Sequence, residues 1–446
     1  MVSGLHVIVG LGLTGFSCAR YLKEAGIPVA ITDTRVNPPH LAALLALYPD
    51  MPVALGEISS SLLDQATTII LSPGIALRLP VIARQVKRGT PVIGDIELFA
   101  RAVKVPVIAI TGTNAKSTVT TLVGLMAEAA GYTVEVGGNL GIPALDLLAN
   151  HPATNLFVLE LSSFQLETTY SLKPQVATVL NVSPDHMDRY DSVSDYQRAK
   201  ARVYHDCYVA VCNRDDSLTE CHHPILDQKI YFTLDTPKQN EFGLVNQHHQ
   251  TYLAKGDQLL LPVNELPVMG KHYQANALAA LAIGYGFGLP FEPMLNVLRD
   301  FKGLPHRCQL VRERDQVKWY NDSKGTNVGA TQAAILGLGS EMSGKLVMIM
   351  GGIGKHADFT SLTPAIEKYS RHVVLMGEAA NDIEAALQRR VPVSFAHSMD
   401  EAVLQAAAIA KPNDSVLLSP ACASFDMFKN YEHRGQVFIE SVERLS

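Results

Sequence analysis

The sequence lacks several features that mark whole classes of proteins. It contains no uncharged apolar stretch of the ~18 residues that a membrane-spanning helix needs, and its apolar amino terminus has no Lys or Arg before Arg20. No Lys/Arg cluster stands out in a chain of net charge −6, which argues against nucleic acid or an anionic membrane surface as a partner. The six cysteines form no Cys-x-x-Cys pair and are typical of reduced thiols. We therefore expect a soluble, monomeric, cytoplasmic protein that acts on small molecules.

What the chain does have is length and a repeated alternation of strand and helix patterns. Its 446 residues are too many for one ordinary core and predict roughly three domains. Short β-branched runs alternate with amphipathic stretches, as in α/β proteins with parallel sheets. We place the domains at residues 1–94, 95–302 and 303–446, the first and third Rossmann-like and the second a P-loop-type ATPase domain. Strand patterns at residues 229–234, 250–255 and 258–263 predict a small antiparallel appendage to the second domain.

A glycine motif near the amino terminus follows a strand pattern and opens a helix pattern. Gly10, Gly12 and Gly15 have the spacing G-x-G-x-x-G, which permits a tight turn, the approach of a diphosphate and close helix–strand packing. Asp33 ends the next strand pattern, where an acid often binds a ribose hydroxyl. Arg35 adds a positive charge that is unusual for a dinucleotide site. The motif favours a nucleotide diphosphate, and a plain packing turn with Asp33 as a helix cap is the alternative.

A second loop, in the stretch ITGTNAKST, resembles a phosphate cradle but departs from the Walker A pattern. Counting back from Lys116, the two glycine positions of that pattern hold Ile110 and Ala115. The loop nevertheless lies between a buried strand pattern and the start of a helix, where backbone N–H groups favour anions. Lys116 would supply charge to the β- and γ-phosphates, and Ser117 or Thr118 a hydroxyl to Mg²⁺. The alternative is a capped helix with a surface lysine.

Two more polar residues follow neighbouring strand patterns. Glu160 ends one strand pattern and His186 comes shortly after the next. In an open α/β sheet, ligands gather at the carboxyl ends of the strands, so both side chains should lie on the same edge as Lys116. Glu160 suits the oxygen coordination of magnesium. Alone, each residue would more often be a helix cap or a surface group.

Seven segments taken together resemble the Mur ligases. They are GTNAKST, ELSSFQLE, NVSPDHMDRY, GLPHR, YNDSKGTN, MGGIGK and LLSPACASFDMF, and they occur in order through the second and third predicted domains. The resemblance as a whole runs from Gly10 to Tyr431. More narrowly, they resemble the branch that adds D-glutamate. The resemblance implies ATP-dependent ligation of D-glutamate to UDP-N-acetylmuramoyl-L-alanine through an acyl phosphate and a tetrahedral intermediate. ADP and phosphate would be released, and the product would serve peptidoglycan precursor synthesis. The first domain would then bind the UDP-sugar and not NAD.

The resemblance also implies site residues, position by position. ATP would bind Gly112, Thr113, Asn114, Ala115, Lys116, Ser117, Thr118, Asn276, Arg307 and Asp322. The UDP-sugar would bind Leu13, Thr14, Asp33, Thr34, Arg35, Gly74 and Asn139. D-Glutamate would bind Lys324, Thr326, Lys355, Ser424 and, as an apolar wall, Phe425. Two Mg²⁺ ions are expected, with Ser117, Glu160, His186 and a CO₂-carbamylated Lys200 as ligands. His306, with Lys116, Glu160, His186 and Lys200, would act in catalysis.

Three positions depart from the family pattern. Ala115 replaces a glycine of the phosphate loop, Tyr273 an asparagine near adenine, and Ile353 an aspartate that often precedes the Lys355 position. Ala115 would cost about 1 kcal/mol if its φ is positive.

Other functions explain fewer residues. A nicotinamide-dependent dehydrogenase would use the first glycine motif but leave Lys116, Glu160 and the third domain without a role. A catalytically silent nucleotide-binding regulator would have no need of Lys116, Glu160, His186 and Lys200. The diaminopimelate or lysine adders typically carry a DNPR segment, which this chain lacks. Folylpolyglutamate synthase would lack the segment that contains Asp33.

Overall fold

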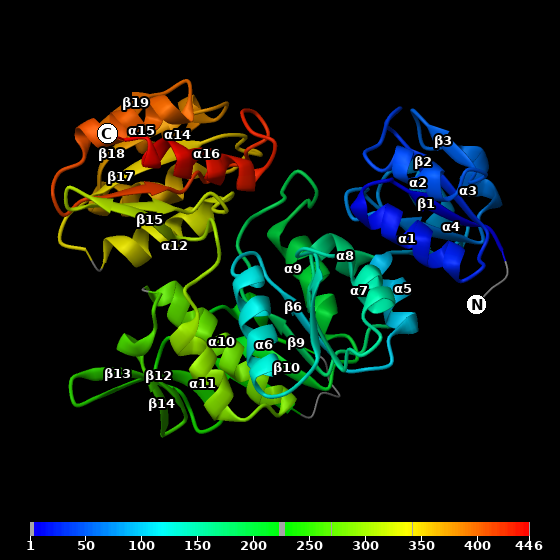
Figure 1. Ribbon diagram of the computed structural model, residues 1–446, viewed down its shortest axis with the longest axis horizontal. Coiled ribbons are helices and arrows are strands. Elements are labelled where there is room, and N and C mark those ends of the chain that lie inside the picture. Colours follow the sequence, from blue (N-terminus) through cyan, green and yellow to red (C-terminus); the bar gives the residue numbers. More distant parts are fainter. Residues whose placement is uncertain (1–3, 223–227, 269, 341, 446) are drawn as a thin grey trace.

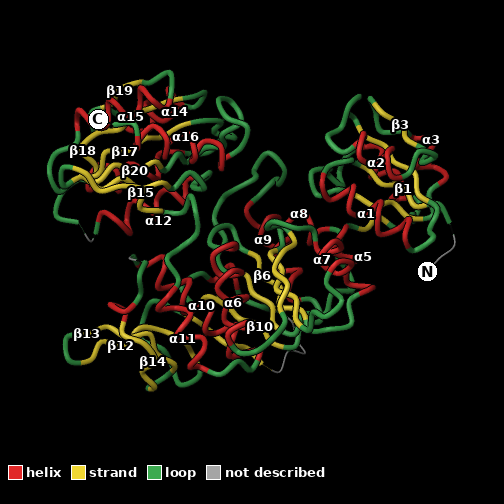
Figure 2. Tube along the Cα trace, viewed as in Figure 1, coloured by secondary structure: helices red, strands yellow, loops and turns green. Residues whose placement is uncertain are grey.

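Each of the three parts of the chain forms its own sheet. The computed structural model describes residues 4–222, 228–268, 270–340 and 342–445. The N-terminal domain (blue in Figure 1) and the C-terminal domain (yellow to red) lie at opposite ends, with the central domain between them. Strands form the interior of each domain and helices cover them (Figure 2). No helix in the described ranges is both long and apolar enough to cross a bilayer.

The N-terminal sheet is parallel throughout and has the strand order β3-β2-β1-β4-β5. Its strands are β1 (His6–Val9), β2 (Val29–Asp33), β3 (Val53–Leu55), β4 (Thr68–Leu71) and β5 (Val92–Ile93). Its helices are α1 (Leu13–Glu24), α2 (Leu41–Leu47), α3 (Ser60–Gln65) and α4 (Pro80–Lys87). The predicted role of Gly15 in close packing is confirmed, because a Cβ there would lie 1.9 Å from the carbonyl oxygen of Gly10. The first helix can therefore start directly against the first strand.

The central sheet has nine strands in the order β14-β13-β12-β11-β10-β9-β6-β8-β7. They are β6 (Val107–Thr111), β7 (Val134–Gly138), β8 (Leu156–Glu160), β9 (Val176–Val179), β10 (Val209–Asn213), β11 (Gln228–Phe232), β12 (Glu241–Gln247), β13 (Gln250–Lys255) and β14 (Gln258–Pro262). The helices are α5 (Asp95–Ala102), α6 (Lys116–Ala129), α7 (Ala144–Asn150), α8 (Ser163–Glu167), α9 (Val193–Ala201), α10 (Lys271–Phe287) and α11 (Phe291–Asp300). Helices α10 and α6 pack together over one face of this sheet.

The antiparallel appendage differs from the prediction in one respect. Strand β11, which was expected to belong to it, pairs in parallel with both β10 and β12. The antiparallel part is therefore β12–β14, and it extends the main sheet. The reason for the error is that Ile230 and Phe232 are buried on one face of β11, a pattern that fits either strand direction. Direction is set by the long connection from β10, which leaves room for a crossover.

The C-terminal sheet has the order β15-β16-β20-β17-β18-β19. Its strands are β15 (Gln309–Arg314), β16 (Val317–Asn321), β17 (Leu346–Gly351), β18 (Ser370–Met376), β19 (Val393–Phe395) and β20 (Ser415–Leu418). Its helices are α12 (Val328–Gly339), α13 (Thr363–Tyr369), α14 (Ala380–Leu387), α15 (Met399–Ile409) and α16 (Tyr431–Glu443). Only the edge strand β15 is antiparallel to its neighbour within this described sheet. Strand patterns at residues 317–322, 345–352, 372–377, 391–396 and 415–420 predict β16 to β20, and no pattern predicts β15.

The N-cap of α6 carries backbone strain. Ala115 has φ +66° and ψ −9°, in the left-handed region where a Cβ is unfavourable. The turn nevertheless lets α6 begin at Lys116 with its amino end facing the loop that follows β6. Ala115 therefore has the positive φ at which the sequence analysis expects an energetic cost for alanine.

We predict that Ala115→Gly raises the free energy of unfolding of the central domain by about 0.5–1 kcal/mol. Glycine removes the left-handed penalty, although its more flexible unfolded chain offsets part of the gain. Urea denaturation followed by circular dichroism measures the change. Ala129→Gly, at an exposed position of the same helix, should lower the free energy of unfolding instead. A lower free energy of unfolding in Ala115→Gly would contradict the inference that Ala115 is strained.

Candidate active site

The phosphate loop lies where the prediction placed it, between the end of β6 and the start of α6. Asn181 accepts bonds from the loop backbone: its carbonyl from the N–H of Thr113 (2.9 Å), and its side-chain Oδ1 from the N–H of Asn114 (2.8 Å). The Lys116 ammonium donates to the carbonyl oxygens of Gly112 and Thr113, each at 3.0 Å. Burial lowers the pKa of Lys116, and the negative charge of Glu160 acts against that shift. A buried ammonium whose bonds go to neutral carbonyls is well placed to bind an anion.

Glu160 at the end of β8 is an ionised carboxylate with an unused oxygen. The side chain is 3% exposed, and its Oε1 accepts a 2.7 Å hydrogen bond from Nδ2 of Asn139. Its Oε2 is buried and has no hydrogen-bond partner. Burial raises the pKa of Glu160, but the nearby Lys116 charge and hydrogen bonds outweigh it, and the net shift is downward. A buried carboxylate oxygen of this kind fits a divalent cation, which prefers oxygen ligands.

His186, in the loop after β9, and Lys200, on α9, lie near the same phosphate loop. His186 has φ +58°, and its ring edge packs against Phe164 with centroids 4.9 Å apart. Lys200, on α9, is 2% exposed and donates to the carbonyl oxygen of Gly112 at 2.7 Å. Burial, followed by repulsion from Lys116, holds the pKa of Lys200 well below its usual range. Lys200 is therefore a buried amine that loses its proton readily.

These groups line one cavity of about 260 Å³ between the central and C-terminal domains. The predicted site residues it brings together are Thr113, Asn114, Ala115, Lys116, Ser117, Asn139, Glu160, His186, Lys200, Arg307, Lys324, Thr326 and Lys355. We call it the ligation cavity. Arg307 crosses between the domains and donates to Oγ of Ser117 at 2.7 Å. The C-terminal domain thus contributes cations directly opposite the phosphate loop.

Sequence reasoning missed several residues of this cavity. Asn327 donates from Nδ2 to Oδ2 of Asp185 and to Oδ1 of Asn114, both at 3.1 Å, and so ties the C-terminal domain to the phosphate loop. Both Asp185 and Asn327 adjoin predicted residues in the segments NVSPDHMDRY and YNDSKGTN. Tyr431 was also missed: its ring lies 3.8 Å below the ammonium of Lys324. Burial lowers the pKa of Lys324 to about 8, and repulsion from Arg307 adds to this effect.

A second cavity, of about 430 Å³, adjoins the phosphate loop on its other side. It contains three further residues that were predicted for ATP, Thr118, Asn276 and Asp322, again with Arg307. Tyr273, one of the departures from the family pattern, also lines it, and its hydroxyl is buried without a hydrogen-bond partner. Burial raises the pKa of Asp322 to about 6, while Oγ of Ser419 donates to its Oδ2 at 2.7 Å.

All seven residues predicted for the UDP-sugar line a third cavity, of about 450 Å³, between the N-terminal and central domains. We call it the UDP-sugar cavity. Asp33 braces the glycine turn there, since its Oδ2 accepts from the backbone N–H of Leu11 at 2.6 Å. Arg35 donates to both carboxylate oxygens of Asp33, and its hydrogen bonds lower the pKa of Asp33 to about 2. Asn139 lines this cavity and the ligation cavity, so the two adjoin.

Four predicted residues, Gly112, His306, Ser424 and Phe425, do not line any of these cavities. Ser424 is 2% exposed, whereas Phe425 is 69% exposed and forms no apolar wall in this arrangement. His306 has φ +62°, and its Nδ1 lies 2.9 Å from Nδ2 of Asn321. Ile353, where relatives often have aspartate, forms a β-bridge with Ala423. That backbone bridge links the loop of Lys355 to the loop of Ser424.

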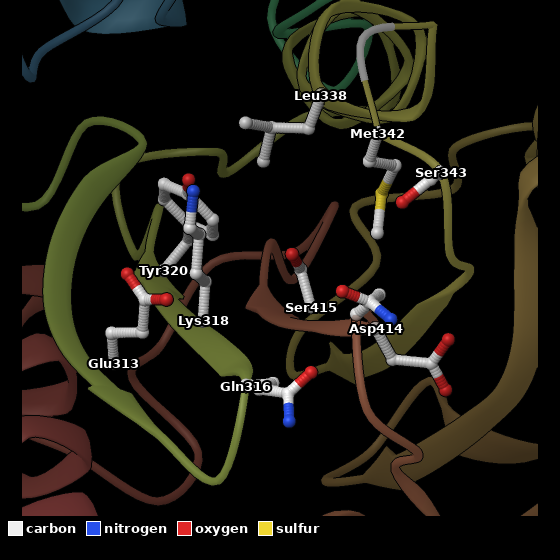
Figure 3. Close-up of a pocket in the computed structure, with 10 residues that line it drawn as sticks. Glu313, Gln316, Lys318, Tyr320, Leu338, Met342, Ser343, Asp414 and Ser415 are labelled. Carbon is white, nitrogen blue, oxygen red and sulfur yellow. The ribbon is translucent and has the colours of Figure 1, made fainter.

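A further cavity, of about 300 Å³, lies at the amino ends of β16 and β20 in the C-terminal sheet (Figure 3). Leu338 and Met342 line one side of it, and Lys318 and Asp414 lie on the other (Figure 3). The Asp414 carboxylate is already used, because it accepts from Nε and Nη2 of Arg371 at 2.6 and 3.0 Å. This cavity contains no predicted site residue.

Family models match the chain in three consecutive parts. Residues 4–94 match the "Mur ligase MurD-like, N-terminal domain", residues 110–284 the "Mur ligase middle domain", and residues 306–422 the "Mur ligase, glutamate ligase domain".

Similar proteins are known along the whole length. The chain is 52% identical over 444 residues to UDP-N-acetylmuramoylalanine–D-glutamate ligase of Pseudomonas aeruginosa, covering 99% of this chain and 98% of the relative. It is 50% identical over 447 residues to the protein of the same name from Legionella pneumophila strain Paris, covering 100% of both.

Solved structures show the same fold at low identity. A pseudomurein peptide ligase type C from Methanothermus fervidus has a TM-score of 0.62 at 18% identity, with both chains fully covered. The UDP-N-acetylmuramate-alanine ligase MurC of Thermotoga maritima has a TM-score of 0.61 at 19% identity, again over both full chains. With full-length relatives at about half identity and all three domain models in order, the chain belongs to the Mur ligase family.

Proposed function

We propose that the chain is the ATP-dependent ligase that joins D-glutamate to UDP-N-acetylmuramoyl-L-alanine in peptidoglycan precursor synthesis. The observation that carries the proposal is the ligation cavity, in which Lys116 and Glu160 of the central domain face Lys324 and Arg307 of the C-terminal domain. The names of the relatives support the choice of substrates. We further propose that the enzyme acts as a monomer in the cytoplasm.

The alanyl carboxylate is a poor electrophile, so the reaction requires that it first be activated. Transfer of the γ-phosphoryl group of ATP to the alanyl carboxylate gives an acyl phosphate and ADP. The amine of D-glutamate then attacks the acyl carbon, the tetrahedral intermediate collapses, and phosphate leaves as the amide forms. Phosphoryl transfer and the departure of phosphate place negative charge on phosphate oxygens, and attack of the amine places it on the acyl oxygen. Preorganised cations at these positions lower the barrier.

The residues of the ligation cavity divide this work. Lys116 and Arg307 would neutralise the transferring phosphoryl group, and Lys324 and Lys355 the two carboxylates of D-glutamate, assisted by Thr326. Ser117, Glu160, His186 and carbamylated Lys200 would hold two Mg²⁺ ions. When bound, Mg²⁺ would supply further neutralisation of phosphate charge. The unused buried oxygen of Glu160 supports that ligand set.

Replacing the central cation should stop turnover. We expect Lys116→Ala to reduce phosphate release by about a thousandfold, because a buried positive charge at the phosphate loop is lost. The assay is phosphate release with UDP-N-acetylmuramoyl-L-alanine and a panel of D- and L-amino acids. Lys104→Ala, at an exposed lysine before β6, should leave the rate unchanged. Persistent turnover of Lys116→Ala would contradict the mechanism, and activity with L-alanine or diaminopimelate, but none with D-glutamate, would overturn the substrate assignment.

Lys200 should carry a carbamate. Its depressed pKa raises the fraction of neutral amine, which is the form that reacts with CO₂. Removing dissolved CO₂ should lower phosphate release several-fold, and added bicarbonate should restore it. A ¹³C carbamate resonance from labelled bicarbonate should appear in the native enzyme and be absent from Lys200→Ala. An unmodified lysine together with full activity in CO₂-free buffer would contradict this prediction.

Dicarboxylate binding should weaken in mildly alkaline solution. Lys324 has a pKa of about 8, so it is cationic below that pH and becomes neutral above it. Glutarate, which has the carboxylates of D-glutamate but no amine, should therefore inhibit less well above pH 8, by up to about tenfold per pH unit. Lys324→Arg should remove this pH dependence, because arginine stays charged. A pH-independent inhibition constant in the native enzyme would show that Lys324 is not the titrating cation.

A further inference from the structure

Two arginines cross the interface between the N-terminal and central domains in opposite directions. Arg189, in the loop after β9, donates from Nη1 to the carbonyl oxygen of Pro73 (3.3 Å) and from Nη2 to that of Ile75 (3.1 Å). In return, Arg78 of the N-terminal domain donates to the carbonyl oxygen of Asp188 (2.8 Å) and to Asp191 (3.0 Å). Helix α8, whose residues Phe164 and Glu167 contact Arg189, lies on the side of the central domain next to the N-terminal domain (Figure 1).

The two arginines are not equivalent. The side chain of Arg189 is 12% exposed. It also forms a 3.1 Å ion pair with Glu167, and the side chain of Glu167 is 19% exposed. Breaking such a largely buried pair leaves a charge without a partner and is costly. Arg78 and Asp191 are 53% and 88% exposed, so water and salt screen their attraction. The Glu167 pair, which lies within the central domain, therefore holds the Arg189 guanidinium in place for its two bonds across the interface, whereas the ion pair of Arg78 is screened by water.

On one side, Arg189 holds the loop that lines the UDP-sugar cavity. Ser72, Pro73, Gly74 and Ile75 all line that cavity. Oγ of Ser72 donates to the carbonyl oxygen of Gly10 at 2.9 Å, which ties this loop to the first glycine turn. The two carbonyls that bind Arg189 flank Gly74. The guanidinium thus fixes the loop on both sides of a residue predicted to bind the UDP-sugar.

On the other side, Arg189 supports the ligation cavity. Its guanidinium stacks over the ring of Phe164 at 4.4 Å, and the edge of the His186 ring packs against that same phenyl group. The backbone N–H of Arg189 donates to the carbonyl oxygen of His186 at 2.9 Å. Phe164 and His186 both line the ligation cavity, whereas Arg189 does not. Through one phenyl ring and one backbone hydrogen bond, Arg189 is thus mechanically linked to His186.

We infer that Arg189 is a positioning residue that sets the distance between the bound UDP-sugar and the phosphoryl donor; this inference rests on the proposed function. The alanyl carboxylate at the far end of the UDP-sugar must lie in line with the γ-phosphate of ATP. An error of about 1 Å in such a placement can cost about a hundredfold in rate. Loss of Arg189 therefore affects the chemical step more than the binding of either nucleotide.

The test compares Arg189→Ala with Arg78→Ala in the full-length enzyme. Phosphate release at varied concentrations of each substrate should show kcat lowered about ten- to a hundredfold in Arg189→Ala. The KM values for ATP and D-glutamate should stay within about twofold, and low millimolar guanidinium should restore part of kcat. Arg78→Ala should stay within about threefold of the native kcat, since its ion pair is exposed.

Other results would overturn the inference. A native kcat in Arg189→Ala would show that the contact does not position the substrate. Loss of ATP binding as well, measured by titration calorimetry in Arg189→Ala and in Arg189→Lys, would show a general role in folding. Failure of the proposed function is recognised separately, because the native enzyme itself would then not ligate D-glutamate.

Discussion

An excess of buried and half-buried positive charge in one small cavity is the constraint on which the rest of the site depends. The side chains of Lys116, Lys200, Arg307, Lys324 and Lys355 line the ligation cavity, together with the carboxylates of Glu160 and Asp185. Mutual repulsion contributes to the depressed pKa of three of them: that of Lys200 is lowered by Lys116, and those of Lys116 and Lys324 by Arg307. Such a cluster is unfavourable alone in a low-dielectric site and becomes favourable when it binds anions. A triphosphate and a dicarboxylate amino acid are ligands of that charge.

The fold creates this cluster by bringing together ends of elements from two domains. The carboxyl ends of β6, β8 and β9 place the phosphate loop, Glu160 and the loop of His186 on one edge of the central sheet. The C-terminal domain then covers this edge, because Arg307 donates a hydrogen bond to Ser117 and Asn327 donates one to Asp185. The N-terminal domain contributes a separate cavity that meets the ligation cavity at Asn139. Each domain thus contributes one part of the site, and the reacting groups can meet only at the boundaries between domains.

The parts of this arrangement that depend on local sequence could be predicted. The glycine turn, the phosphate loop and the shared sheet edge of Glu160 and His186 follow from strand and helix patterns, because parallel strands place their carboxyl ends together. Lys200 could be singled out only by family resemblance, since a lysine in an amphipathic helix is ordinarily exposed. Its burial depends on how α9 packs beneath the phosphate loop, which no local pattern encodes.

Contacts between domains were the part that sequence reasoning could not reach. Asn327 and Arg189 bind residues of another domain, so their partners are fixed only when the domains pack. Tyr431 contacts Lys324, a residue of its own domain that lies far away in the chain. Strand β11 was given the wrong direction because its pattern of buried residues fits either pairing. The polar edge strand β15 was missed because only Val311 among its residues packs against a core cluster of the described chain, which gives a weak apolar signal. Phe425, expected in the amino-acid site, is exposed because it lies outside the cavities that the described domains form.

The central claim is that the cations of the ligation cavity promote transfer of phosphate to a substrate carboxylate. Oxygen-18 in the alanyl carboxylate of UDP-N-acetylmuramoyl-L-alanine tests this claim most directly, with mass spectrometry of the phosphate released. An acyl phosphate predicts that one labelled oxygen per turnover moves into inorganic phosphate. Unlabelled phosphate, formed while the amide product accumulates, would contradict the account.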